Sequence, residues 1–149
     1  MEMKRIDIYS DGACEGNPGP GGYAAIIDED GARREVLGAE RDTTNNRMEL
    51  MAVIRALESL SERSQVRVSS DSQYVVRGMK EWIHSWKRKG WKTATKQPVK
   101  NRDLWERLDV LTRQHEVSWE WVRGHSGHPE NEEVDALAKE AIARMLAGD

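Results

Sequence analysis

Apolar residues recur with the period of an α-helix between residues 45 and 61, and one charged residue interrupts them. At about 100° per residue, the apolar positions gather on one side of such a helix and most polar positions on the other. Glu49 is the exception, because it falls on the apolar side, where a carboxylate is unfavourable unless something compensates it. The pattern predicts an amphipathic helix, capped by Asn45 or Asn46, in which Glu49 needs partners from elsewhere. The apolar positions are Met48, Leu50, Met51, Ala52, Val53, Ile54, Ala56, Leu57 and Leu60.

The other segments alternate between strand-like and helix-like patterns. Alternating and β-branched stretches predict strands over residues 4–11, 23–27, 33–39, 65–70 and 116–122. Helical patterns follow at 71–79, 81–89 and 101–114, and a last helix carries Pro129 in its first turn. The glycine-rich stretch 12–22 is expected to be a tight, irregular connection, and Asp30 with Gly31 a hairpin turn. This order predicts an α/β domain with a mixed five-stranded sheet.

Composition and length are those of an ordinary globular domain. The 149 residues are 38% hydrophobic and 33% charged, which suffices for one core and is far from the composition of disordered chains. No apolar run approaches the roughly 20 residues of a membrane span, and the charged opening is unlike a signal peptide. The single cysteine, Cys14, excludes an internal disulfide and fits a reducing compartment. We therefore expect one cytoplasmic domain over residues 1–149, without membrane contact, and nothing in the sequence requires more than a monomer.

The net charge of −3 conceals a basic segment. Residues 80–102 contain eight lysines and arginines and one acidic residue, a local charge of +7, which leaves −10 for the rest of the chain. Such segregation indicates local contact with an anionic polymer. Trp82 and Trp86 lie four residues apart in this segment and also suit a packed helix face. We expect the tryptophans mainly to pack and the cations to bind.

Three acidic residues are candidate partners for Glu49. Asp11 and Asp71 each follow a predicted strand, and in neighbouring parallel strands both would lie at one edge of the sheet, where open α/β sheets bind ligands. Asp135 borders the apolar stripe of the last helix. Each also has a structural interpretation: Asp11 before Gly12 suits a turn, Asp71 a helix N-cap, and Asp135 the positive end of a helix dipole. Glu49 is the hardest of the four to explain in that way.

Four carboxylates in one place would repel one another and raise one another's pKa values. A divalent cation removes that repulsion, and an all-oxygen ligand set favours Mg²⁺, with Mn²⁺ as a substitute, over zinc. His125 and His128 lack the cysteine cluster that would favour zinc. Two such ions about 3.5–4 Å apart can activate a water and stabilise the leaving oxygen in phosphodiester hydrolysis.

Several spaced motifs become recognisable together. They are Asp11-Gly12 with Gly16-Asn17-Pro18-Gly19, residues 43–50, Ser70-Asp71-Ser72-Gln73-Tyr74, and Gly124-His125 through Pro129-Glu130-Asn131 to Asp135. Over residues 6–141 the chain resembles bacterial type 1 ribonuclease H. The resemblance implies the ribonuclease H-like fold, in which three antiparallel strands precede two parallel ones and helices cover both faces. It also implies a Mg²⁺-dependent endonuclease that cuts the RNA strand of RNA–DNA hybrids, uses two ions with substrate bound, and leaves 5′-phosphate and 3′-hydroxyl ends.

The same resemblance assigns roles to individual residues. Asp11, Glu49, Asp71 and Asp135 would be the metal ligands and catalytic acids, and His125 would assist proton transfer or product departure. The basic segment would be the family's basic, tryptophan-rich protrusion at about 80–100. Thr44 with Asn101 would grip a DNA-strand phosphate, whereas Asn17 and Asn45 have the alternative of serving only a turn and a helix cap. The full set of substrate-binding candidates is Asn17, Thr44, Asn45, Asn46, Gln73, Asn101, Trp82, Trp86, Lys87, Arg88 and Lys89.

The principal hypothesis is therefore a Mg²⁺-dependent endonuclease that acts on RNA–DNA hybrids without an obligate protein partner. A non-catalytic module that binds such hybrids is the alternative, although it would not need Glu49 on a buried helix face. A nuclease of the same fold that acts on DNA junctions is a third candidate, and it would cut DNA substrates.

Overall fold

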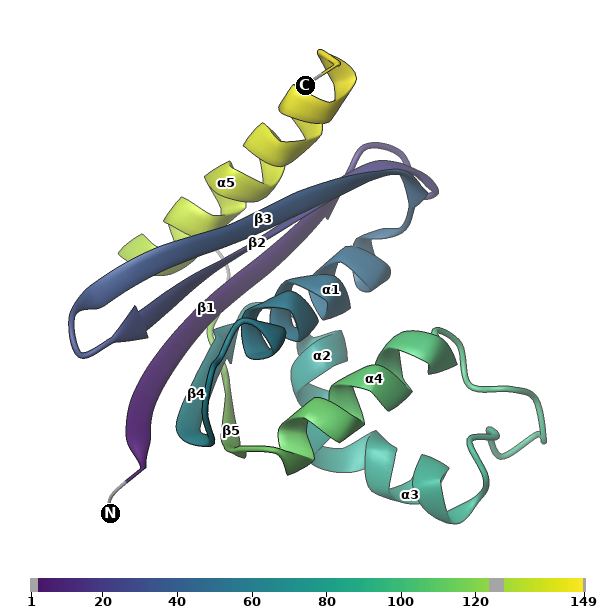
Figure 1. Ribbon diagram of the computed structural model, residues 1–149. Coiled ribbons are helices and arrows are strands. Elements are labelled where there is room, and N and C mark those ends of the chain that lie inside the picture. The colour runs from purple at the N-terminus through teal and green to yellow at the C-terminus, as the bar shows by residue number, and fades with distance from the viewer. Residues whose placement is uncertain (1–2, 124–127, 149) are drawn as a thin grey trace.

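The computed structural model describes residues 3–123 and 128–148, and its five strands form one mixed sheet in the order β3-β2-β1-β4-β5. β1 pairs antiparallel with β2, and β2 with β3, whereas β4 runs parallel to both β1 and β5 (Figure 1). The predicted fold class is confirmed. The strands are β1 (Lys4–Cys14), β2 (Gly19–Glu29), β3 (Ala32–Thr43), β4 (Ser64–Ser70) and β5 (Glu116–Trp121). The helices are α1 (Asn45–Glu58), α2 (Gln73–Arg77), the π-helical turn η1 (Gly78–Trp82), α3 (Ile83–Arg88), α4 (Arg102–Arg113) and α5 (Pro129–Leu146).

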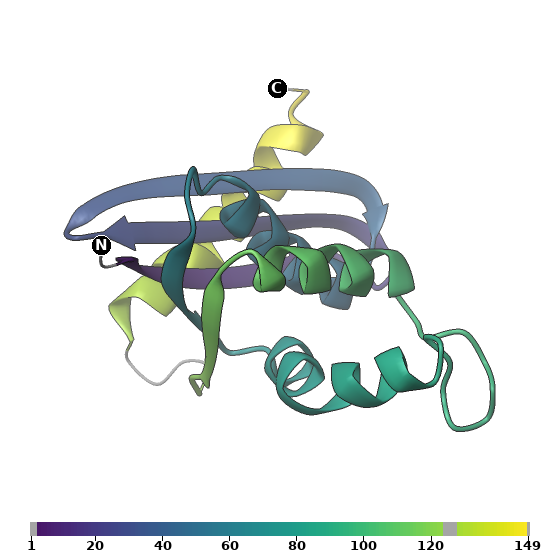
Figure 2. The same cartoon turned by 60° about the horizontal axis from the view of Figure 1, so that its bottom comes forward.

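Helices cover both faces of the sheet. α1 packs on β1 and β2, and α4 packs on α1, so that these helices form the layer on one face. α5 crosses the opposite face over β1, β2 and β3 (Figures 1 and 2). The core lies mainly between the sheet and α1, with Ile8, Val68, Leu50 and Trp105 fully buried. Within the described ranges, no helix combines the length and the apolar character needed to cross a membrane.

The glycine-rich stretch 12–22 is mostly strand, so the prediction of an irregular connection was wrong. β1 and β2 pair through to Cys14 and Gly21, and only residues 15–18 lie between the two strands. Two of the glycines allow helices to approach the sheet. A Cβ at Gly12 would lie 2.5 Å from the Glu49 backbone nitrogen of α1, and a Cβ at Gly22 would lie 2.3 Å from a backbone oxygen of α5.

The predicted amphipathic helix is present as α1, although it ends at Glu58 rather than at residue 61. Its apolar side is buried, and Glu49 is buried with it. The predicted cap was wrong: Thr44, not Asn45 or Asn46, caps the helix. The Thr44 backbone is extended, and its Oγ1 accepts the backbone N–H of Arg47 at 3.3 Å. Both asparagines therefore lie in the first helical turn, where they are exposed.

The chain leaves β4 through a helical region that runs from α2 to α4. Ser72, not Asp71, caps α2, because the Ser72 hydroxyl accepts the backbone N–H of Val75 at 3.2 Å. The structural interpretation of Asp71 as a helix cap is therefore wrong, and α2 begins two residues later than predicted. α2, η1 and α3 follow one another directly, and a loop over residues 89–101 leads back to α4 (Figure 2).

Candidate active site

Three carboxylates meet where the parallel pairing of β1 and β4 ends. Asp11 in β1, Glu49 in α1 and Asp71 after β4 each offer an oxygen, and these three oxygens lie within 4.8 Å of one another. Asp11 and Glu49 are 6% and 5% exposed, whereas Asp71 is half-buried. The structure thus brings together three of the four acids that the sequence singled out.

The register of the sheet explains why the two aspartates meet. β1 and β4 are parallel neighbours, and their last paired residues are Ser10 and Ser70. Asp11 is the next residue of β1 and Asp71 is the first residue after β4, so both side chains lie at the same end of this parallel pair. The missing side chain of Gly12 then allows the backbone of α1 to come close enough for Glu49 to join them.

Burial and mutual repulsion raise the pKa values of the two buried acids. The pKa of Asp11 rises to about 7, first because burial disfavours its charged form and second because of the charge on Asp71. The backbone N–H of Gly12 donates to Asp11 Oδ1 at 2.9 Å and opposes this rise in pKa. The pKa of Glu49 lies well above its usual range, because of burial first and the charge on Asp11 second. At neutral pH the cluster by itself therefore holds protons that exposed carboxylates would have lost.

One oxygen of the cluster has no hydrogen-bond partner in the part of the chain that the structure describes. Glu49 Oε2 is buried, and no donor within residues 3–123 or 128–148 reaches it. A buried acceptor without a partner is rare and unfavourable, so this oxygen calls for an explanation. Three carboxylates that offer only oxygen atoms suit a hard divalent cation such as Mg²⁺ or Mn²⁺. The residues present fit such an ion, which would neutralise the repulsion and give Glu49 Oε2 its partner.

Asp135 is not part of the group within 4.8 Å. It lies in the first half of α5, its side chain is 34% exposed, and its carboxylate is 3.1 Å from Lys139 Nζ. Its negative charge nevertheless contributes to the raised pKa of Asp11, so it lies near the cluster. His125, the predicted fifth member of the site, lies outside the described residues.

Five of the predicted substrate-binding residues lie around the start of α1 and of α2. Asn17, Asn45, Asn46 and Gln73 are exposed. The backbone N–H of Asn45 donates to Asn17 Oδ1 at 3.0 Å, which ties the β1–β2 connection to the first turn of α1. Thr44 Oγ1 accepts the N-cap hydrogen bond from the backbone N–H of Arg47, and the Thr44 hydroxyl can in addition donate its proton to an acceptor. Structural roles therefore exist for Asn17 and Thr44, and both are compatible with ligand binding.

Asn101 is held by two side chains that the sequence patterns did not single out. Its Oδ1 accepts a hydrogen bond from Arg47 at 3.2 Å, and its Nδ2 donates to the Tyr74 hydroxyl at 3.1 Å. Arg47 also donates to both Asp103 carboxylate oxygens, at 3.0 and 2.8 Å, and Trp105 donates to the Tyr74 hydroxyl at 3.0 Å. Asn101 precedes α4 in the left-handed backbone conformation, without a side-chain cap bond. The network orients the Asn101 amide and leaves one of its two N–H groups for a ligand.

The tryptophans of the basic segment pack against one another. The ring centroid of Trp86 lies 5.9 Å from that of Trp82, 6.4 Å from that of Trp91 and 5.2 Å from that of the buried Trp105. This aromatic cluster ties α3 and the following loop to α4. Local periodicity could have found Trp82 and Trp86, whereas the contact with Trp105 depends on how the helices pack.

The cations at the end of α3 directly follow Trp86 of the aromatic cluster in the chain and are exposed. Lys87, Arg88 and Lys89 all lie at the surface. Lys87 already forms an ion pair within the protein, because its Nζ lies 3.2 Å from the nearly buried Asp109 carboxylate. Arg88 and Lys89 are therefore better placed than Lys87 to meet an external anion.

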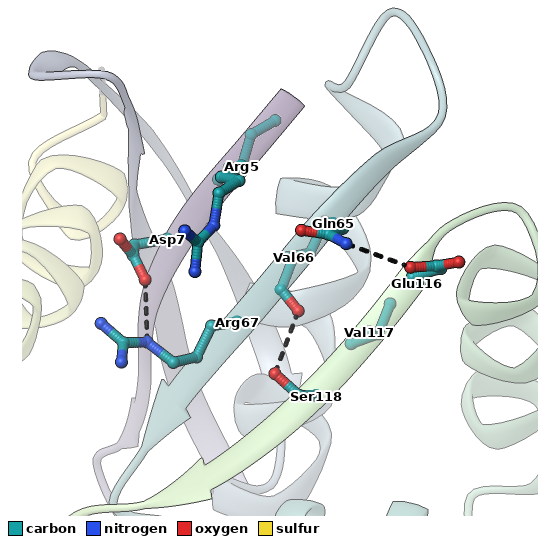
Figure 3. Close-up of a pocket in the computed structure, with 9 residues that line it drawn as sticks. Arg5, Asp7, Gln65, Val66, Arg67, Glu116, Val117 and Ser118 are labelled. Atoms are coloured by element: carbon teal, nitrogen blue, oxygen red, sulfur yellow. Dashed lines mark hydrogen bonds and ion pairs between the residues drawn. The ribbon is translucent and has the colours of Figure 1, made fainter. Parts of the chain in front are cut away.

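A hollow lies at the other end of the parallel strands, away from the carboxylate cluster (Figure 3). Arg67 Nε donates to Asp7 Oδ1 at 2.9 Å across it, and Gln65 Nε2 donates to Glu116 at 3.4 Å. Because these side chains largely pair with one another, this hollow lacks the concentrated charge of the cluster. Its lining residues are Arg5, Ile6, Asp7, Gln65, Val66, Arg67, Glu116, Val117 and Ser118.

The fold and the cluster together define an α/β protein with a candidate divalent-cation site at the edge of a mixed sheet. Comparison with known proteins identifies the family. The sequence profile of the RNase H family matches residues 3–143, and the chain belongs to this family.

Individual relatives match over nearly their whole length. Ribonuclease H of Stutzerimonas stutzeri is 58% identical over 139 residues, which are 93% of this chain and 92% of that protein. Ribonuclease H of Escherichia coli O9:H4 is 58% identical over 147 residues, which are 99% of this chain and 95% of that protein. The resemblance to bacterial ribonuclease H is confirmed.

Two solved structures extend the comparison to the fold. LC9-RNase H1, described as a type 1 RNase H with the type 2 active-site motif, is 36% identical with a TM-score of 0.86, covering 96% of this chain and 74% of that one. LC11-RNase H1 in complex with RNA/DNA hybrid is 28% identical with a TM-score of 0.74, covering 95% of this chain and 99% of that one.

Proposed function

We propose that the chain is an endonuclease that hydrolyses the RNA strand of RNA–DNA hybrids. The observation that carries this proposal is Glu49, a buried carboxylate that meets Asp11 and Asp71 within 4.8 Å and has an oxygen without a partner in the described ranges. A module that only binds hybrids would lose stability from such a cluster and gain nothing from it. Membership of the RNase H family, and a relative solved with an RNA/DNA hybrid, support the substrate class.

Asp11, Glu49 and Asp71 would hold Mg²⁺, or Mn²⁺ as a substitute, with Asp135 as a fourth ligand. Two bound ions would supply an activated water and stabilisation of the leaving oxygen, which gives products with 5′-phosphate and 3′-hydroxyl ends. The carboxylates must lose their protons to act as ligands, so the raised pKa of Asp11 makes ion binding stronger above neutral pH. His125 would assist proton transfer or product departure.

The substrate would be recognised on both strands. Uncharged amides can read the 2′-hydroxyl groups of the RNA strand across the shallow minor groove of the hybrid. Thr44 and Asn101 would grip a phosphate of the DNA strand, and the cations of the basic protrusion would neutralise further phosphates. The residues proposed to read the RNA strand are Asn17, Asn45, Asn46 and Gln73, and those proposed at the protrusion are Trp82, Trp86, Lys87, Arg88 and Lys89.

The proposal requires no second protein. One chain carries the three clustered carboxylates and the basic segment, so we propose a monomer that acts as a single domain over residues 1–149. The free thiol of Cys14 supports a reducing location, which we propose to be the cytoplasm.

The test is an incubation of the purified chain with end-labelled RNA–DNA hybrid, RNA duplex, DNA duplex and a DNA junction, with Mg²⁺ or with EDTA. We expect cutting of the hybrid RNA alone, only with Mg²⁺, and product ends that a ligase can rejoin. Glu49→Gln should be inactive, whereas Glu58→Gln, on the exposed side of the same helix, should be active. Intact RNA that is nevertheless retained in a gel shift would favour the binding module, and cut DNA would favour a junction nuclease.

A further inference from the structure

Trp121 is the last residue of β5, and its side chain binds the main chain of a cluster residue. The indole Nε1 donates to the backbone carbonyl oxygen of Asp71 at 3.1 Å. One residue away, the backbone N–H of Val122 donates to the carbonyl oxygen of Ser70 at 2.9 Å. The end of β5 therefore holds two successive carbonyl groups of the neighbouring chain, one through its backbone and one through the indole.

This contact falls where regular sheet pairing ends. Ser70 is the last residue of β4 to pair with β1 on one side and with β5 on the other. After Asp71 the chain turns towards α2, which begins at Gln73 with Ser72 as its cap. The indole thus fixes the backbone of Asp71 between the end of the strand and the start of the helix.

Packing alone does not account for an indole in this position. Trp121 is 42% exposed, so a large part of its apolar surface stays in contact with water, unlike that of a core tryptophan. Trp119, two residues earlier on the same face of the strand, packs against the main hydrophobic core. Of the two side chains, Trp119 contributes apolar packing and Trp121 contributes a directed hydrogen bond to Asp71.

Of the three clustered carboxylates, Asp71 is the least enclosed by the protein. Asp11 and Glu49 are buried, whereas Asp71 is half-buried. Partners that hold a metal ligand in place commonly change metal affinity by about tenfold to a hundredfold. A backbone anchor one residue beyond the end of the strand would restrict where the Asp71 carboxylate can point.

We propose that Trp121 is a positioning residue, whose indole N–H holds the Asp71 main chain so that the Asp71 carboxylate stays with Asp11 and Glu49 to bind a divalent cation. The inference rests on the proposed function of the cluster as a cation site. It assigns Trp121 no contact with the ion or with the reacting atoms.

The test compares Trp121→Phe with Trp119→Phe, which is the same substitution on the same face of the same strand. Each metal-free protein is titrated with Mn²⁺ by isothermal calorimetry without substrate, after circular dichroism has checked its fold. We expect Trp121→Phe to bind Mn²⁺ about tenfold more weakly than the unaltered protein, and Trp119→Phe to bind it as the unaltered protein does. The Mg²⁺ concentration for half-maximal cleavage should rise by a similar factor, with kcat recovered at saturating Mg²⁺.

A second measurement uses the unaltered protein and does not depend on the folding of a variant. Mn²⁺ below one equivalent should broaden the indole N–H resonance of Trp121 more than that of Trp82. Equal broadening would place the ion elsewhere than beside Asp71 and would overturn the proposal. Full Mn²⁺ affinity in Trp121→Phe, or an equal loss in Trp119→Phe, would overturn it as well.

Asp11→Asn separates failure of this inference from failure of the proposed function. If the unaltered protein binds no Mn²⁺, the cluster is not a cation site and both proposals are wrong. If the unaltered protein binds Mn²⁺, Asp11→Asn loses the binding and Trp121→Phe keeps it in full, only the positioning role of Trp121 is wrong.

Discussion

Replacing Asp11 with asparagine should abolish cleavage and, at the same time, stabilise the protein without cations. Asp11 is 6% exposed, and its pKa rises from 3.8 to about 7 in the folded protein. A carboxyl group with a raised pKa favours the folded state while it keeps its proton. This contribution is fully present below about pH 4 and is lost as the pH rises through about 7, so an ionised Asp11 opposes folding above that range.

The size of the effect follows from the change in pKa. A rise of about three pKa units corresponds to about 4 kcal/mol above pH 7. Asparagine does not ionise, its oxygen can still accept the N–H of Gly12, and its amide adds a donor beside Glu49, whose Oε2 has no partner among residues 3–123 and 128–148. We expect a gain of about 2–4 kcal/mol in the free energy of unfolding, or about 6–13 °C in Tm for a domain of this size.

Urea unfolding followed by circular dichroism in EDTA, at pH 5 and at pH 8.5, measures this gain. It should be full at pH 8.5 and smaller at pH 5, and added Mg²⁺ should reduce it by stabilising only the unaltered protein. Asp7→Asn is the matched control on the same strand, because the Asp7 side chain is 40% exposed and paired with Arg67 at 2.9 Å, so loss of its charge should not stabilise the protein. A variant no more stable than the unaltered protein at pH 8.5, or a gain as large at pH 5, would show that ionisation of Asp11 does not oppose folding.

Other variants test the basic segment, the contact between strand and helix, and the aromatic cluster. The double variant Arg88→Ala with Lys89→Ala should bind hybrid more weakly, with kcat unchanged. The slope of the logarithm of the binding constant against the logarithm of salt concentration should become shallower by up to about 2, and an unchanged slope would mean that these residues do not contact phosphates. Gly12→Ala should lower the free energy of unfolding, measured by urea titration, by about 1–3 kcal/mol, because the new Cβ would lie 2.5 Å from the Glu49 backbone nitrogen. Unchanged stability would contradict the close packing of α1 on β1. Tyr74→Phe removes the hydroxyl that accepts hydrogen bonds from Asn101 and Trp105. In hybrid cleavage it should raise KM by a severalfold larger factor than it lowers kcat, whereas a loss in kcat alone would contradict a role of this network in substrate binding.

The sequence predicted most elements well because their patterns are local. The helix over 45–61 and the strands near Ile8 and Val68 have the periodicity of their own secondary structure. The error at 12–22 has a different origin. Glycine is a turn signal when only neighbours in the chain are considered, but Gly12 and Gly22 lie in paired strands where helices far along the chain approach. No local pattern carries that information.

The order of the elements, the family resemblance and the anomaly of Glu49, a charge where a helix should be apolar, could all be predicted from the sequence. Which acids meet depends on how the elements pack. The tertiary structure brought Asp11, Glu49 and Asp71 within 4.8 Å, left Asp135 outside that group, and set Trp121 against the backbone of Asp71. The physical reason is that periodicity depends on neighbours in the chain, whereas these distances depend on the parallel register of β1 and β4 and on the approach of α1 at Gly12.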